Sequence, residues 1–195
     1  QTNLGAIFFA RHLYQPLMYI SSKAYIVEET GEKLIEMKPV ALNEGERDFV
    51  NDLKAFYENT PDFFDGKELY LLRNQSRSGI GFFEASGFYP DFILWLIVGK
   101  KQYVTFIDPK GIRNLDKGLR SHKVQLFNTL KTVISKRIND PDMSLDSYII
   151  SNTLYDEVSH WQGGETIDGF NRNHVYFQKE QRDQYINQLL NSILA

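Results

Sequence analysis

Apolar residues recur along the chain at spacings that predict alternating helices and strands. Between residues 44 and 58 they fall on one helical face: Phe49, Val50, Leu53, Phe56 and Tyr57. Asn43 is a residue type that caps helices, and Asn59-Thr60-Pro61 is a sequence that ends them. We therefore expect the first core helix over residues 44–58.

The N-terminal part predicts an extension. Residues 3–14 are expected to form a short helix that stops before Pro16. Residues 24–37 are expected to form two strands around a turn that contains Gly31. The chain would thus consist of a helix and hairpin extension over residues 1–43, packed as one compact unit with a core domain over residues 44–195.

The rest of the chain alternates strands with helices. Strand composition is found at residues 67–73, 147–151 and 174–178, and the Gly-containing stretch 74–87 is expected to be a loop. Helical stripes run through residues 121–138 and 181–194, and a polar connection separates the last two strands. This order predicts an α/β fold with a mixed central β-sheet flanked by helices.

Two adjacent apolar segments, residues 91–98 and 102–108, have hairpin spacing. If Gly99 and Lys100 form a two-residue turn, residues whose numbers sum to 199 face each other across the antiparallel strands. Asp91 then lies opposite Asp108, and Lys110 shares their face because side chains alternate along a strand. Both faces of the hairpin are otherwise apolar, so we expect helices to cover both.

Opposed carboxylates repel each other, because paired Cβ atoms are only about 5 Å apart. A divalent cation offsets this repulsion, and Mg²⁺ takes one or two carboxylates together with waters and substrate phosphate oxygens. Lys110 would place an ammonium group beside the same pocket. The structural alternative is an ion pair of Lys110 with one carboxylate at the end of a sheet.

The residues around this hairpin also resemble a known motif. Two short sequences carry the resemblance: Tyr89-Pro90-Asp91-Phe92 and Asp108-Pro109-Lys110. Separated by a strand-turn-strand, they resemble the PD-(D/E)XK nuclease superfamily. Residues 89–95 and 106–111 are similar to the nuclease domain that ends type III restriction subunits and related helicase-nucleases. The resemblance covers roughly residues 44–155, and those relatives usually carry Glu where this chain has Asp108.

The resemblance implies a restriction-endonuclease-like fold and a Mg²⁺-dependent endonuclease that cuts DNA to leave 5′-phosphate ends, with Mn²⁺ as a substitute ion. It implies that Asp91, Asp108 and Lys110 are catalytic, and that the two carboxylates and the backbone carbonyl of Pro109 bind the metal. It also implies a helicase or ATPase region upstream in the same polypeptide. This chain itself contains no G-x-x-x-x-G-K-[ST] loop.

A further carboxylate has two candidates. Relatives often supply an acid from the first core helix, in a Glu-x-x-Phe-x-x-Asp-Leu pattern that begins at Glu46 in this chain. Glu46 also has capping-box spacing from Asn43, which offers a purely structural role. Glu84, in the loop before Asp91, is the substitute candidate.

A basic stretch follows the predicted site. Residues 110–137 contain eight Lys or Arg and one acid, although the net charge of the whole chain is −3. Attraction to nucleic acid must therefore come from local clustering. Lys117, Arg120 and Lys123 directly follow the predicted active strand, so we expect them to contact DNA phosphates; a solvated helix face is the alternative.

Composition limits the class of protein. The 195 residues, 42% of them hydrophobic, suffice for one sizeable core, and they include no Cys and no apolar run long enough to span a membrane. No secretory signal opens the chain, so we expect a part of a longer cytoplasmic protein. His122, His160 and His174 lack metal-ligand spacing and are expected to be surface or structural residues.

The rival function is a catalytically inactive nuclease-fold module that binds nucleic acid or docks within a larger motor protein.

Overall fold

The computed structural model describes residues 4–12, 17–20, 40–75, 79–82, 87–161, 164–182 and 184–195. Within these ranges a six-stranded mixed sheet has the order β2-β4-β5-β6-β7-β8. Its strands are β2 (Arg11–His12), β4 (Lys67–Arg73), β5 (Phe92–Val98), β6 (Lys101–Lys110), β7 (Met143–Ser151) and β8 (Val175–Phe177). β4, β5 and β6 are antiparallel neighbours, and the other three pairs are parallel.

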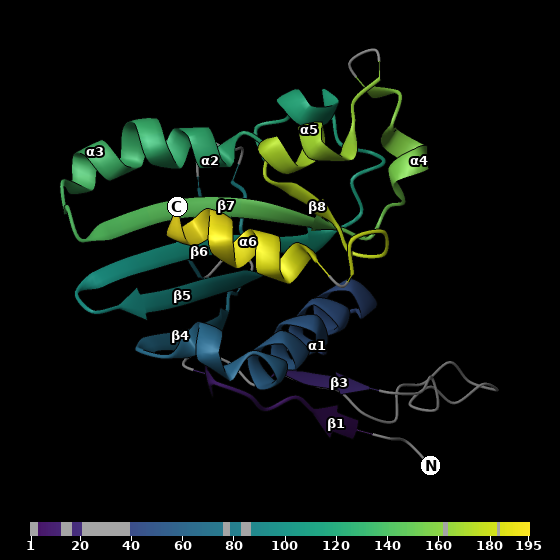
Figure 1. Cartoon of the computed structure of the whole chain (residues 1–195). Helices are drawn as coiled ribbons and strands as arrows, with labels where there is room; N and C mark the ends of the chain where they lie inside the picture. Colours follow the sequence, from purple (N-terminus) through teal and green to yellow (C-terminus); the bar gives the residue numbers. More distant parts are fainter. Residues whose placement is uncertain are drawn as a thin grey trace.

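Helices cover both faces of this sheet (Figure 1). One face carries α1 (Glu44–Asn59) and α6 (Tyr185–Leu194), and the other carries a continuous helix made of α2 (Leu126–Thr129), a π-helical turn η4 (Leu130–Ile134) and α3 (Ser135–Ile138). The prediction of an α/β fold with a mixed sheet flanked by helices is confirmed. No helix of the described ranges is long and apolar enough to cross a membrane.

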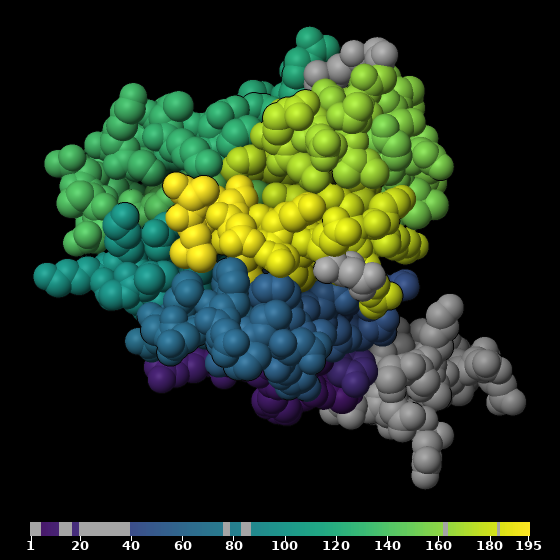
Figure 2. Space-filling model, in the orientation of Figure 1, coloured from purple at the N-terminus to yellow at the C-terminus, as the bar shows by residue number. Residues whose placement is uncertain are grey.

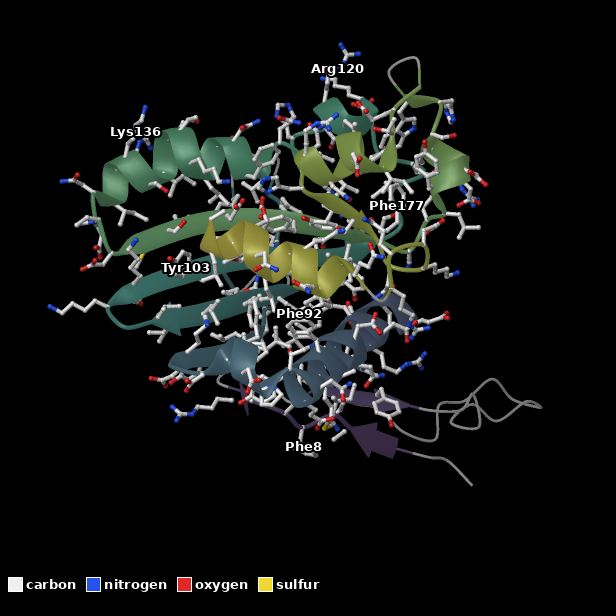
Figure 3. The ribbon with its side chains drawn as sticks, viewed as in Figure 1. Phe8, Phe92, Tyr103, Arg120, Lys136 and Phe177 are labelled. Carbon is white, nitrogen blue, oxygen red and sulfur yellow. The ribbon has the colours of Figure 1, made fainter. Side chains whose placement is uncertain are left out.

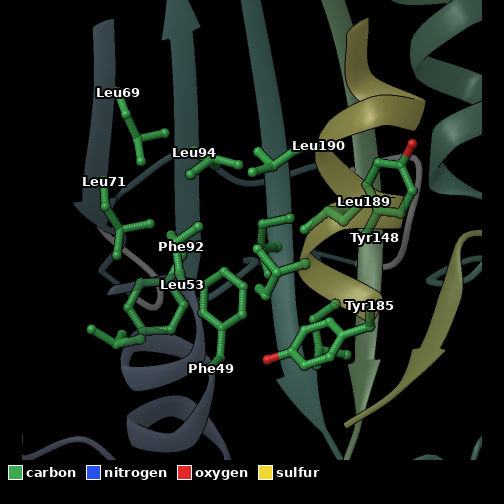
Figure 4. Close-up of a cluster of buried hydrophobic side chains, with 14 of the residues drawn as sticks. Phe49, Leu53, Leu69, Leu71, Phe92, Leu94, Tyr148, Tyr185, Leu189 and Leu190 are labelled. Carbon is green, nitrogen blue, oxygen red and sulfur yellow. The ribbon is translucent and has the colours of Figure 1, made fainter. Parts of the chain in front are cut away.

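The larger core lies between the sheet and helices α1 and α6. Phe49 and Leu53 of α1 meet Phe92 and Leu94 of β5, and Leu189 of α6 closes the cluster (Figure 4). All five side chains are fully buried, because the apolar stripe of each helix faces the apolar strands. In Figure 2 the yellow helix α6 lies across this face beside the blue segments of α1 and of η1 (Pro61–Phe64).

The β5–β6 hairpin has the predicted register. Val98 pairs with Lys101 and Phe92 pairs with Ile107, and the Gly99 φ of 60° is a conformation that glycine adopts without steric cost. Alternation then sends Phe92 and Ile107 to the α1–α6 core, while Ile93 and Phe106 enter a separate core under α2. Both faces of the hairpin are therefore buried, as the apolar pattern predicts.

The expected helix over residues 3–14 is wrong. Leu4–Ala6 forms β1, which pairs antiparallel with β3 (Met18–Ile20), and β2 pairs with β4 at the edge of the main sheet. A helix this short is marginal by itself, whereas strand pairing satisfies the backbone groups immediately. The expected hairpin over residues 24–37 lies outside the described residues.

Three further boundaries differ from the prediction. The strand expected from residue 147 begins at 143, because β7 pairs with β6 from Gln102 onward. The helix expected from residue 121 begins at 126, after turns over residues 121–125. The helix expected from residue 181 begins at 185, because the Gln181 side chain accepts a hydrogen bond from the Phe177 backbone N at 2.8 Å and caps the end of β8 instead.

The polar connection between β7 and β8 contains α4 (Tyr155–Val158) and α5 (Ile167–Arg172). Val158 and Phe170 are buried there in a third core against β8. Their side chains are separated by Gly-containing turns, which obscure the helical spacing in the sequence.

Candidate active site

A cavity of about 610 Å³ opens where the carboxyl end of β6 meets the start of α1. Figure 1 shows that these two ends lie at the same side of the sheet. The cavity wall contains Glu46, Asp91, Asp108, Pro109 and Lys110. Residues from the first helix, the start of β5 and the end of β6 therefore converge on one space.

Asp91 is held by the turn before β5. The backbone N of Asn74 donates to the Asp91 carbonyl and its side chain donates to the Pro90 carbonyl, both at 2.8 Å. Because Phe92 pairs with Ile107, the next position outward sets Asp91 beside Asp108. The two carboxyl groups are close enough for each charge to affect the other, since Asp108 raises the pKa of Asp91.

The pKa of Asp91 is raised to about 8. Burial is the largest cause, followed by the charges of Asp108 and Glu46 and the hydrogen bond with Asp108, while Lys110 acts in the opposite direction. Asp91 is consequently protonated at neutral pH. A proton thus relieves the repulsion that the hairpin register predicts.

Lys110 is paired with Asp108. Its Nζ lies 2.6 Å from Asp108 Oδ2, and the Asp108 side chain is 7% exposed. This buried oxygen makes no hydrogen bond of regular geometry within the described chain. The ion pair suits a structural role too, but it neutralises only one of the four acids in the described cavity wall, Glu44, Glu46, Asp91 and Asp108. The other acids call for another explanation.

Glu46 is both a helix cap and a wall of the cavity. Asn43 N donates to Glu46 Oε2 at 3.0 Å, and Glu46 N donates to Asn43 Oδ1 at 2.9 Å, so the capping box is complete. The pKa of Glu46 is raised by burial and by Asp108, against the opposing effects of Asn43 and Arg73. The two roles predicted for Glu46 are therefore compatible. Glu84 lies outside the described residues.

Arg73 was missed by the sequence analysis. Its Nη2 lies 3.8 Å from Glu46 Oε2, and its Nη1 is buried without a hydrogen-bond partner in the described part of the chain. Burial lowers the pKa of this guanidinium, whereas Glu46 and Asp91 raise it. The available signal was an Arg at the third inward position of β4, after the buried Leu69 and Leu71.

The basic residues divide into two groups. Lys123 is a wall of the cavity. Lys117 and Arg120, beside and within the short helix η3 (Gly118–Arg120), are exposed and lie outside that wall. Figure 3 shows Arg120 and Lys136 projecting from the outer edge of the molecule, away from the sheet.

The residues of the cavity fit Mg²⁺. In the described ranges no three His, Cys, Asp or Glu side chains form a group that could hold a metal ion. Two carboxylates are nevertheless the usual protein share for Mg²⁺, whose other ligands are waters and substrate oxygens. Burial and the neighbouring carboxylates raise the pKa of Asp91, so this group of acids favours an added proton or cation.

The resemblance also predicts a backbone oxygen, the Pro109 carbonyl, as a metal ligand. Lys110 O accepts a hydrogen bond from Asn152 N, just beyond β7, at 3.2 Å. Carbonyls alternate in direction along an extended strand, so the Pro109 carbonyl faces the β5 side, where Asp91 lies. The predicted Pro109 ligand is therefore compatible with the strand geometry.

A second buried acid cluster surrounds Asp146 on β7. Asp146 Oδ1 lies 3.0 Å from His174 Nδ1, and Oδ2 lies 2.9 Å from Lys131 Nζ. The imidazole of His174 stacks between Phe127 and Tyr148, with centroid distances of 4.0 and 4.3 Å. His174 is therefore a structural residue, as predicted.

Neither described cavity includes a residue of the Asp146 cluster. The chain matches no protein-family model, and no curated protein or solved structure matches it either.

Proposed function

We propose that this chain is the catalytic domain of a Mg²⁺-dependent endodeoxyribonuclease of the PD-(D/E)XK type. The convergence of Asp91, Asp108, Lys110 and Glu46 on one cavity carries the proposal. The mixed sheet with helices on both faces is compatible with a restriction-endonuclease-like fold. From the resemblance we also propose DNA as the substrate and a restriction or helicase-nuclease protein, with an upstream helicase region, as the setting.

The protein residues have separate tasks in this reaction. Asp91, Asp108 and the Pro109 carbonyl would hold Mg²⁺, which when bound activates a water and neutralises charge on the phosphate. Asp91 must first release the proton that it holds at neutral pH. Lys110, already beside Asp108, orients the attacking water and stabilises the charge that develops on the phosphate.

Glu46 and Arg73 support the groups that would hold the metal. The contacts of Glu46 with Asn43 and Arg73 both fall on Oε2, so Oε1 has no partner among the residues described. This oxygen is available to a water in the cavity. Arg73 opposes the rise in the pKa of Glu46 and thereby favours its charged form.

A plasmid-nicking assay tests this proposal. The full chain is incubated with supercoiled DNA and Mg²⁺ or Mn²⁺, and with EDTA as the control. We expect metal-dependent nicking that Lys110→Ala abolishes. The matched control is Lys101→Ala, which removes an exposed lysine from the other end of β6 and should leave nicking unchanged. Nicking that survives in Lys110→Ala would reject the assignment, and an inactive wild type must be retested within the longer protein.

The second candidate function is an inactive module that retains the nuclease fold. The observation in its favour is the Lys110–Asp108 ion pair, which would also stabilise a sheet end. Calorimetry with Mg²⁺ or Mn²⁺ separates the two functions. Binding that is lost in both Asp91→Asn and Asp108→Asn supports the nuclease, and an absence of any such binding supports the inactive module.

A further inference from the structure

The cavity contains a second lysine that the strand motif does not include. Eight Lys and Arg lie between residues 110 and 137, and of these Lys110 and Lys123 form part of the cavity wall. Lys123 comes from the turns before α2 and joins Lys110 of β6 in the wall of the cavity. It is partly buried, unlike the exposed Lys117 and Arg120.

Both lysines lie against one aromatic ring. The Nζ atoms of Lys110 and Lys123 are 5.2 and 5.6 Å from the ring centroid of Phe88. Phe88 is buried, and its backbone exchanges hydrogen bonds with Phe82, so the ring is fixed in place. The negative face of an aromatic ring attracts cations. Phe88 therefore holds two ammonium groups near each other despite their mutual repulsion.

The two lysines differ in their charge partners. Lys110 has Asp108 at 2.6 Å, whereas Lys123 has no carboxylate within ion-pair distance in the described part of the chain. The charge of Lys110, followed by burial, lowers the pKa of Lys123, and the charge of Asp108 opposes this shift. A partly buried cation beside another cation is costly unless an anion joins it. The charge of Lys123 is thus available to an anion in the cavity.

We propose that Lys123 is a further catalytic residue, which binds a non-bridging oxygen of the scissile phosphodiester. Asp91, Asp108 and the Pro109 carbonyl would hold the metal, and Asp108 already engages Lys110, so Lys123 is the cation of the cavity wall left for the substrate. Its role in cleavage rests on the proposed nuclease function. The anion site itself rests on the cavity wall, the shared ring and the unpaired ammonium group.

Two measurements on the full chain test Lys123. The first is the single-turnover cleavage rate at saturating enzyme with Mg²⁺, and the second is the affinity for a short DNA duplex in EDTA as a function of salt. Lys123→Ala should slow cleavage by about 10²-fold, the usual effect of removing one preorganised donor. It should also reduce the slope of log affinity against log salt by about 0.9.

Control variants separate this role from folding and from general charge. Lys136→Ala removes one positive charge from the exposed end of α3 and should keep the wild-type rate at saturating enzyme. Lys123→Arg should restore most of the EDTA binding, and Lys123→Gln should melt at the wild-type temperature while it cleaves as slowly as Lys123→Ala. A structural role for Lys123 would instead lower the melting temperature in all three Lys123 variants.

The outcomes distinguish the two proposals. If wild type cleaves DNA and Lys123→Ala cleaves equally fast, Lys123 does not bind the scissile phosphate and the inference is overturned, while the nuclease assignment stands. If wild type cleaves no DNA even within the longer protein, the nuclease assignment fails. The DNA affinity measured in EDTA then tests the anion site at Lys123. A salt slope reduced by Lys123→Ala and restored by Lys123→Arg supports the anion site, and an unchanged slope overturns it.

Discussion

Two clusters around buried acids lie on the paired strands β6 and β7. They differ in how far neighbouring cations neutralise their carboxylates. Around Asp146, each carboxylate oxygen has a nitrogen partner, one on His174 and one on Lys131. Around Asp108, the described cavity wall contains four acids, Glu44, Glu46, Asp91 and Asp108, and two lysines, of which only Lys110 makes an ion pair with one of them. The first cluster is balanced internally, and the second has a surplus of acids.

The pKa values of Asp146 and Asp91 are shifted in opposite directions. Burial alone would raise the pKa of Asp146, but the hydrogen bonds and charges of His174 and Lys131 hold it below its ordinary value. Burial raises the pKa of Asp91 to about 8, and the neighbouring carboxylates add to the rise. A balanced cluster stabilises the fold and has no need of a ligand, whereas a surplus of acids beside a cavity favours a cation or a proton.

The largest effect expected concerns cleavage. Asp108→Asn should reduce metal-dependent nicking by about 10³-fold. The metal-free protein should keep a melting temperature close to that of wild type, because without the charge of Asp108 the neighbouring Asp91 ionises more easily and replaces it beside Lys110. Asp116→Asn, at an exposed position, is the control. A large drop in melting temperature with nicking preserved in the folded protein would place Asp108 with Asp146 as a structural acid.

The reverse is expected for Asp146. Asp146→Ala leaves His174 and Lys131 without their shared acid, so the free energy of unfolding should fall by about 3–5 kcal/mol. Denaturant unfolding measures this change, with Asp116→Ala as the exposed control. The folded variant should retain nicking at saturating DNA. A loss well under 1 kcal/mol would mean that the Asp146 cluster is not the stabilising one.

The pH dependence of stability should also distinguish the two clusters. The raised pKa of Asp91 means that its contribution to stability is complete below the ordinary carboxyl pKa and is lost as pH rises through about 8. Without metal, wild type should therefore lose melting temperature between about pH 5 and 8, and Asp91→Asn should lose less.

The affinity for Mg²⁺ should depend on pH through the same proton on Asp91. Affinity measured by calorimetry should rise about tenfold per pH unit below pH 8 and then level off, because each ion displaces one proton from Asp91. Titrations in two buffers of different ionisation enthalpy count that proton. Binding that is independent of pH, with no proton released, would contradict the assignment of Asp91 as a ligand.

Removing Arg73 should have a smaller effect. Arg73→Gln takes away a charge that lowers the pKa of Glu46, so the acidic limb of the pH–rate profile should move to higher pH. Arg73→Lys should restore part of the shift. An unmoved profile with a lower melting temperature would make Arg73 a packing residue.

The smallest effect is expected from the exposed cations. The double variant Lys117→Ala, Arg120→Ala should weaken DNA binding and lower the salt slope by about 0.9 for each DNA phosphate that it no longer neutralises, while cleavage at saturating DNA is retained. Affinity measured across a salt series provides the test. An unchanged slope would show that this part of the basic stretch is only a solvated surface.

The sequence by itself determined the local elements and one long-range relation. The helix from residue 44 and the strand over residues 67–73 follow from periodicity and capping, which depend on neighbouring residues only. The opposition of Asp91 and Asp108 follows from the length of the turn at Gly99 and from the alternation of side chains. A tight hairpin turns a short sequence separation into a fixed register, so the amino-acid sequence suffices to predict this part of the candidate site.

Only the tertiary structure decided which remote residues join that pair. It brings Glu46 to the cavity with Arg73 beside it, includes Lys123 but leaves out Lys117 and Arg120, and pairs Asp146 with His174. The pairing of β4 with β5 sets Arg73 opposite Phe92, and the pairing of β7 with β8 brings His174 beside β7, and no local pattern encodes which distant strands will meet. The balance of charge in each cluster, and hence the direction of each pKa shift, depends on burial and distance that exist only after the sheet has formed.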